Sequence, residues 1–290
     1  MLFDDYGKVV FYDGAMGTML LNCGLKPGER PDVLNIAAPE AVENVHRMYV
    51  EAGSDIIVTN TFGANAEALR RTGHTPEAVI RAAVDNAKRA CGDSTKIALD
   101  IGPLGYLLEP LGDAKYEWAY DLFKQQAVIG KNAGADFVAI ETMSDLTELE
   151  ACMKAISDNT DFPMLVTMTF DRTGCTFTGC SPEIFATTAE RLGAAAVGLN
   201  CSLAPEEMYD IAERIVRTTD LPFIAKPNAG LPDPQTGLYN IGPAEFAHQM
   251  MPFVNMGAKL IGGCCGTTPD YIKAMRELVG STATVIARRP

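Results

Sequence analysis

The chain has 290 residues, 47% of them hydrophobic and 21% charged, and its 24 Lys and Arg against 37 Asp and Glu give a net charge of −13. This composition supports a large core and excludes wholesale disorder, and the negative charge argues against a protein that binds nucleic-acid backbone. No apolar run approaches the roughly 20 residues that cross a bilayer, and the acidic start at residues 1–5 is unlike a signal peptide. We therefore expect a cytoplasmic protein that binds neither nucleic acid nor membrane, whose 8 Cys are metal ligands or core residues instead of disulfides.

Short apolar runs rich in Val, Ile and Phe recur along the whole chain. Most of them are continuous and do not alternate with polar residues, which is typical of strands buried on both faces of a parallel sheet. The predicted strands are residues 9–12, 55–61, 97–101, 137–142, 164–170, 195–202, 222–227 and 259–264.

The segments between these strands have the spacing and the termini of helices. One apolar stripe at helical spacing consists of Ala41, Val45, Met48, Tyr49 and Ala52. A hydroxyl side chain followed by Pro and an acid is a usual helix start, and it occurs at Thr75-Pro76-Glu77, Ser181-Pro182-Glu183 and Thr268-Pro269-Asp270. Helix ends that need a positive φ are predicted at Gly53, Gly134, Gly193 and Gly257.

Eight strand-then-helix units follow one another without a break in composition. Eight is the number that closes a (β/α)8 TIM barrel, so we predict an α/β fold with one barrel over residues 1–280 and a C-terminal tail over 281–290. The alternative is a doubly wound open sheet. Against it, the turn Asp13-Gly14-Ala15-Met16-Gly17 after the first strand lacks the G-x-G-x-x-G fingerprint of dinucleotide binding.

In such barrels the chemistry gathers at the carboxyl ends of the strands. The residues at those ends are unusually polar for so apolar a scaffold. They include Asp13, Asn60, Asp100, Glu141, Asn200, Cys201, Asn228, Cys264 and Cys265.

The adjacent cysteines Cys264 and Cys265 are the sharpest signal in this set. In a regular strand they would point to opposite faces, so both reach one ion only where the strand ends and the flanking glycines free the backbone. With Cys201 they make a three-thiolate zinc site that keeps one position open, as catalytic zinc sites do. A packed pair or a vicinal disulfide is the alternative for Cys264 and Cys265.

The other cysteines and the histidines show no ligand spacing. Cys23, Cys91, Cys152, Cys175 and Cys180 are expected to be inert core or surface residues. His46 and His248 lie in helical stretches and His74 in a loop, so we expect structural roles for all three.

Five motifs give the chain a family resemblance. They are Asp13-Gly14-Ala15-Met16-Gly17-Thr18, Thr59-Asn60-Thr61-Phe62-Gly63-Ala64-Asn65, Gly198-Leu199-Asn200-Cys201-Ser202, Pro227-Asn228-Ala229-Gly230 and Gly262-Gly263-Cys264-Cys265-Gly266-Thr267-Thr268-Pro269. Together and in this order they resemble the homocysteine S-methyltransferase family, and within it the N-terminal homocysteine-binding barrel of cobalamin-dependent methionine synthases. The resemblance runs from about Val9 to Leu278, nearly the whole chain.

The resemblance implies a set of site residues. One Zn²⁺ per chain would be held by the catalytic cysteines Cys201, Cys264 and Cys265, and the amino group of homocysteine by Asp13 and Glu141. The substrate carboxylate would meet the backbone amides of Gly14, Ala15, Met16, Gly17 and Thr18. Asn200 counts among the substrate contacts, and Asn228 could occupy the zinc position that the substrate later fills.

A sulfur-rich zinc site suits methyl transfer to a thiol. A free aliphatic thiol with a pKa near 8.5 is only about 3% thiolate at neutral pH, and coordination to zinc deprotonates it. Three thiolate ligands keep the fourth sulfur electron-rich, whereas a His-rich zinc site favours activation of water. The residues therefore favour alkyl transfer to a thiol over hydrolysis, and the resemblance implies a zinc-dependent thiol S-methyltransferase that converts homocysteine to methionine.

The methyl donor is a separate question. With 290 residues the chain holds only the first barrel of such a methionine synthase, so we expect a methylcorrinoid (methylcobalamin) on a separate protein. S-methylmethionine or a betaine is the alternative donor, although a quaternary ammonium calls for an aromatic cage and the single Trp118 is expected away from the barrel mouth.

Two other classes of function stay open. One is a non-catalytic module that binds zinc or homocysteine within a methyltransferase complex. The other is an aldolase-like barrel in which Lys226 forms a Schiff base. More often an inward lysine at a barrel mouth pairs with an acid, and Asp100 is the candidate partner.

Overall fold

The structure is a computed structural model that describes residues 9–26, 28–92, 95–233 and 235–286. Eight strands form one parallel sheet in the order β1-β8-β7-β6-β5-β4-β3-β2. They are β1 (Val10–Phe11), β2 (Ile56–Val58), β3 (Lys96–Ile101), β4 (Phe137–Met143), β5 (Met164–Met168), β6 (Ala196–Asn200), β7 (Phe223–Lys226) and β8 (Ala258–Ile261). A parallel bridge between Tyr12 and Ile56 joins β1 to β2 and completes the ring. The predicted (β/α)8 barrel is confirmed, and the doubly wound sheet is wrong.

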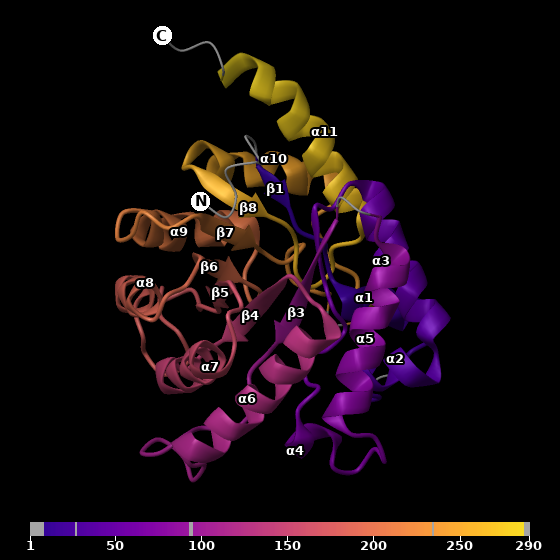
Figure 1. Cartoon of the computed structure of the whole chain (residues 1–290). Coiled ribbons are helices and arrows are strands. Elements are labelled where there is room, and N and C mark those ends of the chain that lie inside the picture. The colour runs from indigo at the N-terminus through magenta and orange to yellow at the C-terminus, as the bar shows by residue number, and fades with distance from the viewer. Residues whose placement is uncertain (1–8, 27, 93–94, 234, 287–290) are drawn as a thin grey trace.

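Helices surround this ring and lead from each strand to the next (Figure 1). They are α1 (Met16–Asn22), η1 (Pro31–Val33), α2 (Leu34–Ala37), α3 (Pro39–Ala52), α4 (Ala66–Leu69), α5 (Pro76–Ala90), α6 (Tyr116–Ala133), α7 (Leu146–Asn159), α8 (Pro182–Arg191), η2 (Pro205–Met208), α9 (Tyr209–Val216), α10 (Pro243–Asn255) and α11 (Pro269–Ile286). Within the described ranges, none of these helices has both the length and the apolar character needed to span a bilayer.

The helix termini follow the sequence signals. The side chain of Thr75 accepts a hydrogen bond from the Ala78 amide at the start of α5, and that of Ser181 accepts one from Ile184 at the start of α8. Gly53 ends α3 with φ +102°, a backbone conformation that glycine adopts without steric cost. Local sequence thus sets where the elements start and stop.

The buried face of α3 differs from the predicted stripe. Val42, Val45 and Tyr49 are fully buried as a helix face requires, but Met48 is 37% exposed. Met48 precedes Tyr49 by one residue and is therefore turned about 100° away from it around the helix axis. The polar His46 is buried in its place, and burial lowers its pKa to about 4, so it is neutral at physiological pH.

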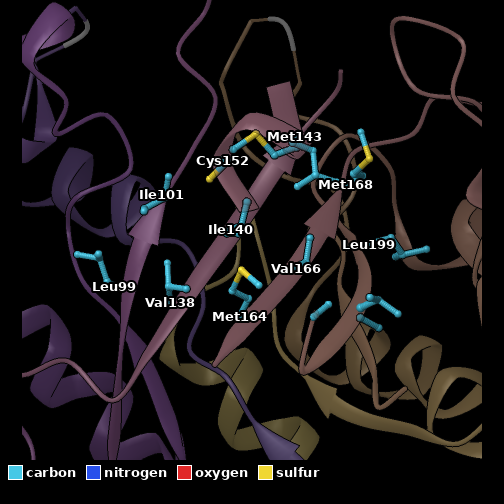
Figure 2. Close-up of a cluster of buried hydrophobic side chains, with 14 of the residues drawn as sticks. Leu99, Ile101, Val138, Ile140, Met143, Cys152, Met164, Val166, Met168 and Leu199 are labelled. Carbon is cyan, nitrogen blue, oxygen red and sulfur yellow. The ribbon is translucent and has the colours of Figure 1, made fainter. Parts of the chain in front are cut away.

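The core has two layers that the strands separate. Side chains such as Ala98, Ala139 and Ile224 fill the inside of the barrel. Their neighbours along the strands point outward and pack under the helices, as Figure 2 shows for Leu99, Ile101, Val138, Ile140, Met164, Val166 and others of β3 to β6. Because strand side chains alternate, the next inward positions after Ala98, Ala139 and Ile224 fall at the carboxyl ends of the strands. Those positions are Asp100, Glu141 and Lys226.

The C-terminal helix α11 continues to Ile286 and projects beyond the barrel (Figure 1). The boundary predicted at residue 280 falls inside this helix. Residues 287–290 of the predicted tail lie outside the described residues, and the division of the chain stays a prediction.

Candidate functional site

A cavity of about 530 Å³ opens at the carboxyl ends of the strands. It lies where the barrel fold places its chemistry. Its lining comprises Asp13, Gly14, Ala15, Met16, Gly17, Thr18, residues 28–32, Val58, Thr59, Asn60, Phe62, Gly63, Asp100, Glu141, Thr142, Cys201, Lys226, Gly263, Cys264 and Cys265. Most of the predicted site residues therefore meet in one place, although they come from six different strand ends.

Three sulfur atoms converge on one side of this cavity. The Sγ atoms of Cys201, Cys264 and Cys265 lie within 4.8 Å of one another, and those of Cys201 and Cys265 are 3.9 Å apart. Among the described residues, this is the one group of at least three His, Cys, Asp or Glu side chains with such a geometry. All eight cysteines of the chain are free, so Cys264 and Cys265 do not form the alternative vicinal disulfide.

Backbone contacts between loops hold the sulfurs in position. The amide of Cys201 donates to the Lys226 carbonyl at 3.1 Å, and the amide of Cys264 donates to the Pro227 carbonyl at 2.8 Å. Both cysteine-bearing segments are thus tied to the end of β7, the strand that lies between β6 and β8 in the sheet. The end of β8 leaves the regular ladder here, which lets adjacent cysteines face the same cavity.

Unusual backbone conformations surround the cluster. Thr142, Cys201 and Ser202 have φ of 62°, 63° and 60°, a left-handed region that costs residues other than glycine on the order of 1 kcal/mol or more. The fully buried Asn200 stabilises one of them, since its Oδ1 accepts from the Thr142 amide at 2.8 Å and its Nδ2 donates to the Thr142 hydroxyl at 2.8 Å. The same Nδ2 lies 3.9 Å from the Cys264 sulfur. Asn200 therefore positions its neighbours and is absent from the cavity lining.

The donor set fits a tetrahedral zinc ion. Zinc–sulfur bonds of about 2.3 Å place the sulfurs of a tetrahedral site about 3.8 Å apart, close to the 3.9 Å between Cys201 and Cys265. The Asn228 side chain hydrogen-bonds to Cys201, and its Oδ1 atom is buried with no hydrogen-bond partner among the described residues. Asn228 is absent from the cavity lining, and its role as a fourth, exchangeable ligand stays a prediction.

The thiols share their protons unequally. Hydrogen bonds from Cys264 and Cys265, with a smaller contribution from the Asn228 side chain, hold the pKa of Cys201 well below its usual range. The same contacts with Cys201 raise the pKa values of Cys264 and Cys265. The cluster therefore favours a thiolate at Cys201, the protonation state in which cysteine binds a metal.

The other side of the cavity carries charge. Lys226 Nζ lies 2.5 Å from Glu141 Oε2 and 4.6 Å from the centre of the Tyr12 ring. The expected partner Asp100 is wrong, because Lys226 extends across the barrel interior to β4. Burial opposes the charge on Lys226, but the carboxylates of Glu141 and Asp13 outweigh it and raise the pKa above its ordinary value.

Asp13 is buried at the end of β1. Burial raises the pKa of its carboxyl to about 7, against the opposing effects of Lys226 and of the Val58 amide, which donates to Asp13 Oδ2 at 2.8 Å. The next residue, Gly14, has no room for a side chain, because a Cβ would lie 2.6 Å from the Thr267 hydroxyl and 2.9 Å from that of Tyr49. The turn into α1 is therefore pressed against the segment after β8, and its backbone lines the cavity.

Residues 28–32 form one rim of the cavity and lie outside the five sequence motifs. The guanidinium of Arg30 binds Asp32 Oδ2 at 2.6 Å and the Gly63 carbonyl at 2.8 Å. Asn60, in turn, donates to the Pro31 carbonyl at 2.7 Å. These contacts fasten residues 28–32 over the cavity, and their partners are about thirty positions apart in the chain, so spacing alone does not reveal them.

Trp118 is placed in the first turn of α6, which starts at the mouth end of the barrel. It packs edge-on against Tyr106, with ring centres 5.3 Å apart, and is not among the residues that line the cavity. Phe62 is the single Phe, Tyr or Trp in that lining, and this counts only the described part of the chain. The cavity therefore does not present an aromatic cage.

A closed barrel with three convergent thiols on one side of its mouth and buried carboxylates on the other belongs to the class of barrel enzymes with their chemistry at the strand ends, and its cysteine cluster could bind a metal ion. Comparison with known families identifies the family of the chain. The homocysteine S-methyltransferase family model matches residues 10–279, and the chain belongs to this family of methyltransferase enzymes.

Individual relatives agree with this assignment. The chain is 31% identical to a methionine synthase of Mycobacterium leprae (strain TN), over 94% of this chain and 24% of that protein. It is 32% identical to a methionine synthase of Mycobacterium tuberculosis (strain ATCC 25618 / H37Rv), over 98% of this chain and 25% of that protein. The chain thus spans about a quarter of the length of these relatives.

A solved structure shares the fold. The metallated form of the homocysteine methyltransferase MmuM from Escherichia coli superimposes with a TM-score of 0.83, at 23% identity, over 96% of this chain and 98% of that one. At this level of identity the likeness establishes the barrel architecture alone.

Proposed function

We propose that this chain is a zinc-dependent methyltransferase that converts homocysteine to methionine. The observation that carries the proposal is the three-sulfur cluster of Cys201, Cys264 and Cys265 at a cavity whose opposite side holds buried carboxylates. Membership of the homocysteine S-methyltransferase family supports the same substrate. The free cysteines suit a reducing compartment, so we place the protein in the cytoplasm.

The three cysteines would hold the zinc ion, with Asn228 Oδ1 as the ligand that an incoming substrate replaces. When bound, zinc supplies a deprotonated substrate thiol at neutral pH, where a free thiol is only about 3% ionised. The reaction therefore needs this chain to present the substrate sulfur toward the open side of the cluster and to keep its other groups away from the incoming methyl.

The remaining cavity residues would bind the amino-acid part of homocysteine. Asp13 and Glu141 carry the carboxylates that suit an ammonium, and charge-assisted hydrogen bonds of this kind are the stronger ones in proteins. The substrate carboxylate would meet the turn from Gly14 to Thr18, whose first helical amides have no partner within α1. Asn200 would act indirectly, by holding Thr142 and Cys264.

We further propose that the methyl group comes from a methylcorrinoid carried by a separate protein. The sequence similarity to methionine synthases over nearly the whole chain supports this donor. The lack of an aromatic cage among the described cavity residues disfavours a quaternary ammonium donor such as a betaine. S-methylmethionine is the second candidate, which the family assignment leaves available.

A donor comparison tests the proposal. Purified zinc-loaded protein is incubated with homocysteine and either methylcobalamin, S-methylmethionine or betaine, and methionine is quantified, with Cys201→Ser as the inactive control. We expect methionine from methylcobalamin. Turnover with S-methylmethionine alone would overturn the corrinoid donor, and binding of zinc and homocysteine without turnover from any donor would identify a non-catalytic module.

The aldolase alternative is disfavoured by the same geometry. A Schiff base needs a neutral lysine, whereas Glu141 holds the Lys226 ammonium charged. We expect no covalent adduct when the protein is treated with borohydride and a carbonyl substrate. A trapped adduct on Lys226, located by mass spectrometry, would contradict this assignment.

A further inference from the structure

Asp100 is the last inward-facing residue before the end of β3, two positions after Ala98 in the barrel interior. Its side chain lines the cavity, and the residue is only 8% exposed. Its position at a strand end predicts pairing with Lys226, but Lys226 binds Glu141 instead. Asp100 is thus a buried acid whose purpose the contacts described so far do not explain.

The backbone of Asp100 is held firmly, while its carboxylate is left free. The amide of Asp100 donates to the Thr59 hydroxyl at 3.1 Å, and its carbonyl accepts from the Thr61 hydroxyl at 2.8 Å. The two threonine hydroxyls are themselves 2.7 Å apart. The Oδ1 atom of Asp100, however, is buried with no hydrogen-bond partner among the described residues.

Asp13 and Glu141, which line the cavity with Asp100, each have a donor at one carboxylate oxygen. Asp13 accepts from the Val58 amide, and Glu141 is bound to Lys226. An unsatisfied buried carboxyl group costs free energy unless a ligand supplies a hydrogen bond. Burial and the neighbouring Glu141 raise the pKa of Asp100 well above its usual range, which a cation placed beside it would reverse.

We propose that Asp100 accepts the α-ammonium group of the substrate together with Asp13 and Glu141, and so helps to select an amino-acid thiol over a thiol without an amino group. Lys226 occupies Glu141 Oε2, whereas no described residue donates a hydrogen bond to Asp100 Oδ1. Asp13 borders the same end of the cavity from β1. This inference rests on the proposed function, because it assumes that the substrate thiol is bound at the cysteine cluster.

Calorimetric binding to the zinc-loaded protein tests the inference without a methyl donor. The ligands are homocysteine and 4-mercaptobutanoate, which is homocysteine without its amino group. We expect the wild type to bind homocysteine more tightly, and Asp100→Asn to weaken homocysteine binding about tenfold to a hundredfold, the effect of losing one charged hydrogen bond. Binding of 4-mercaptobutanoate should change less than about twofold, since that thiol has no ammonium for Asp100 to accept.

Matched controls separate this role from a structural one. Asp85→Asn makes the same chemical change on the exposed face of α5 and should leave both affinities unchanged. Zinc content and the thermal melting curve are recorded for each variant, and Asp100→Ser serves as a second substitution if Asp100→Asn folds poorly. Equal affinities of the wild type for the two thiols, or equal losses for both in the Asp100 variants, would overturn the inference.

The result also separates this inference from the proposed function. If the wild type methylates homocysteine and the Asp100 variants lose affinity equally for both thiols, only the role of Asp100 is contradicted. If the Asp100 variants lose affinity for homocysteine alone and the wild type transfers no methyl group, the role of Asp100 is supported and the proposed reaction is contradicted.

Discussion

The two sides of the cavity are organised in different ways. On the sulfur side, hydrogen bonds between loop backbones place Cys201 and Cys264, and left-handed conformations at Cys201 and Ser202 turn the chain toward the cavity. On the acidic side, regular strand alternation aims Asp100, Glu141 and Lys226 inward, and side-chain pairing then decides which charge is satisfied. The proposed metal site needs fixed distances between sulfur atoms, and the backbone sets these distances. The proposed ammonium site needs an acceptor oxygen without a donor, and the pairing of the charged side chains decides which oxygen that is.

Removing one sulfur should have the largest effect and should be confined to the sulfur side. A structural zinc site contributes about 10–16 kcal/mol through four ligands, so losing one ligand weakens binding about a hundredfold to a thousandfold. We therefore expect Cys201→Ser to lose bound zinc and methyl transfer together, as measured by metal analysis and methionine formation. The exposed Cys23→Ser is the matched control. Full zinc content in Cys201→Ser would show that the cluster is not the metal site.

Breaking the pair on the acidic side should affect folding more than metal binding. Glu141→Gln leaves the Lys226 ammonium buried without its nearest counter-ion, a change that costs about 3–5 kcal/mol in comparable pairs. We expect this loss in urea unfolding of the zinc-loaded protein. The double variant Glu141→Gln with Lys226→Met should recover most of it, because both charges are then gone. A double variant no more stable than the single one would contradict the pairing.

Asn200 links the two sides, since it contacts Thr142 on β4 and Cys264 after β8. Groups that orient metal ligands typically contribute about tenfold to a hundredfold in metal affinity. Asn200→Ala should therefore weaken zinc binding about tenfold in a chelator competition while all three cysteines remain. The control Asn44→Ala, on the exposed face of α3, should leave the zinc affinity unchanged. An unchanged zinc affinity in Asn200→Ala would limit Asn200 to supporting the backbone.

The smallest expected effect is a pH dependence of the unfolding free energy that arises from Glu148. Glu148 in the first turn of α7 is 3% exposed and accepts from the Leu104 amide of the loop after β3 at 2.7 Å. Burial raises its pKa to about 7, so the folded protein holds this proton longer than the unfolded chain does. Stability is therefore lost as the pH rises from about 4.5 to about 7, by roughly 1–3 kcal/mol.

Glu148→Gln has no proton to lose and keeps an oxygen for the Leu104 amide. Its unfolding free energy should fall less than that of the wild type between about pH 5 and about pH 8. Parallel pH profiles for the two proteins would show that Glu148 does not titrate in this range.

Much of the site could be predicted from sequence, because the residues at strand ends follow from the positions of the strands. The meeting of Cys201, Cys264 and Cys265 is such a case, since the ends of eight parallel strands lie at one edge of a closed sheet. The pairing of Lys226 could not be predicted. Asp13, Asp100 and Glu141 all lie at the same end, and a period of two residues shows that a side chain points inward without showing how far it reaches.

The sequence by itself determined the barrel, its helix termini and the residues at its mouth, because apolar periodicity, capping residues and adjacent cysteines act over short stretches of chain. Only the tertiary structure decided the partners. Lys226 and Glu141 are 85 positions apart and meet across the barrel interior, and Arg30 reaches Gly63 over the cavity rim. Such contacts depend on distances across the closed ring, where burial makes each unsatisfied charge costly and so selects one pairing among several.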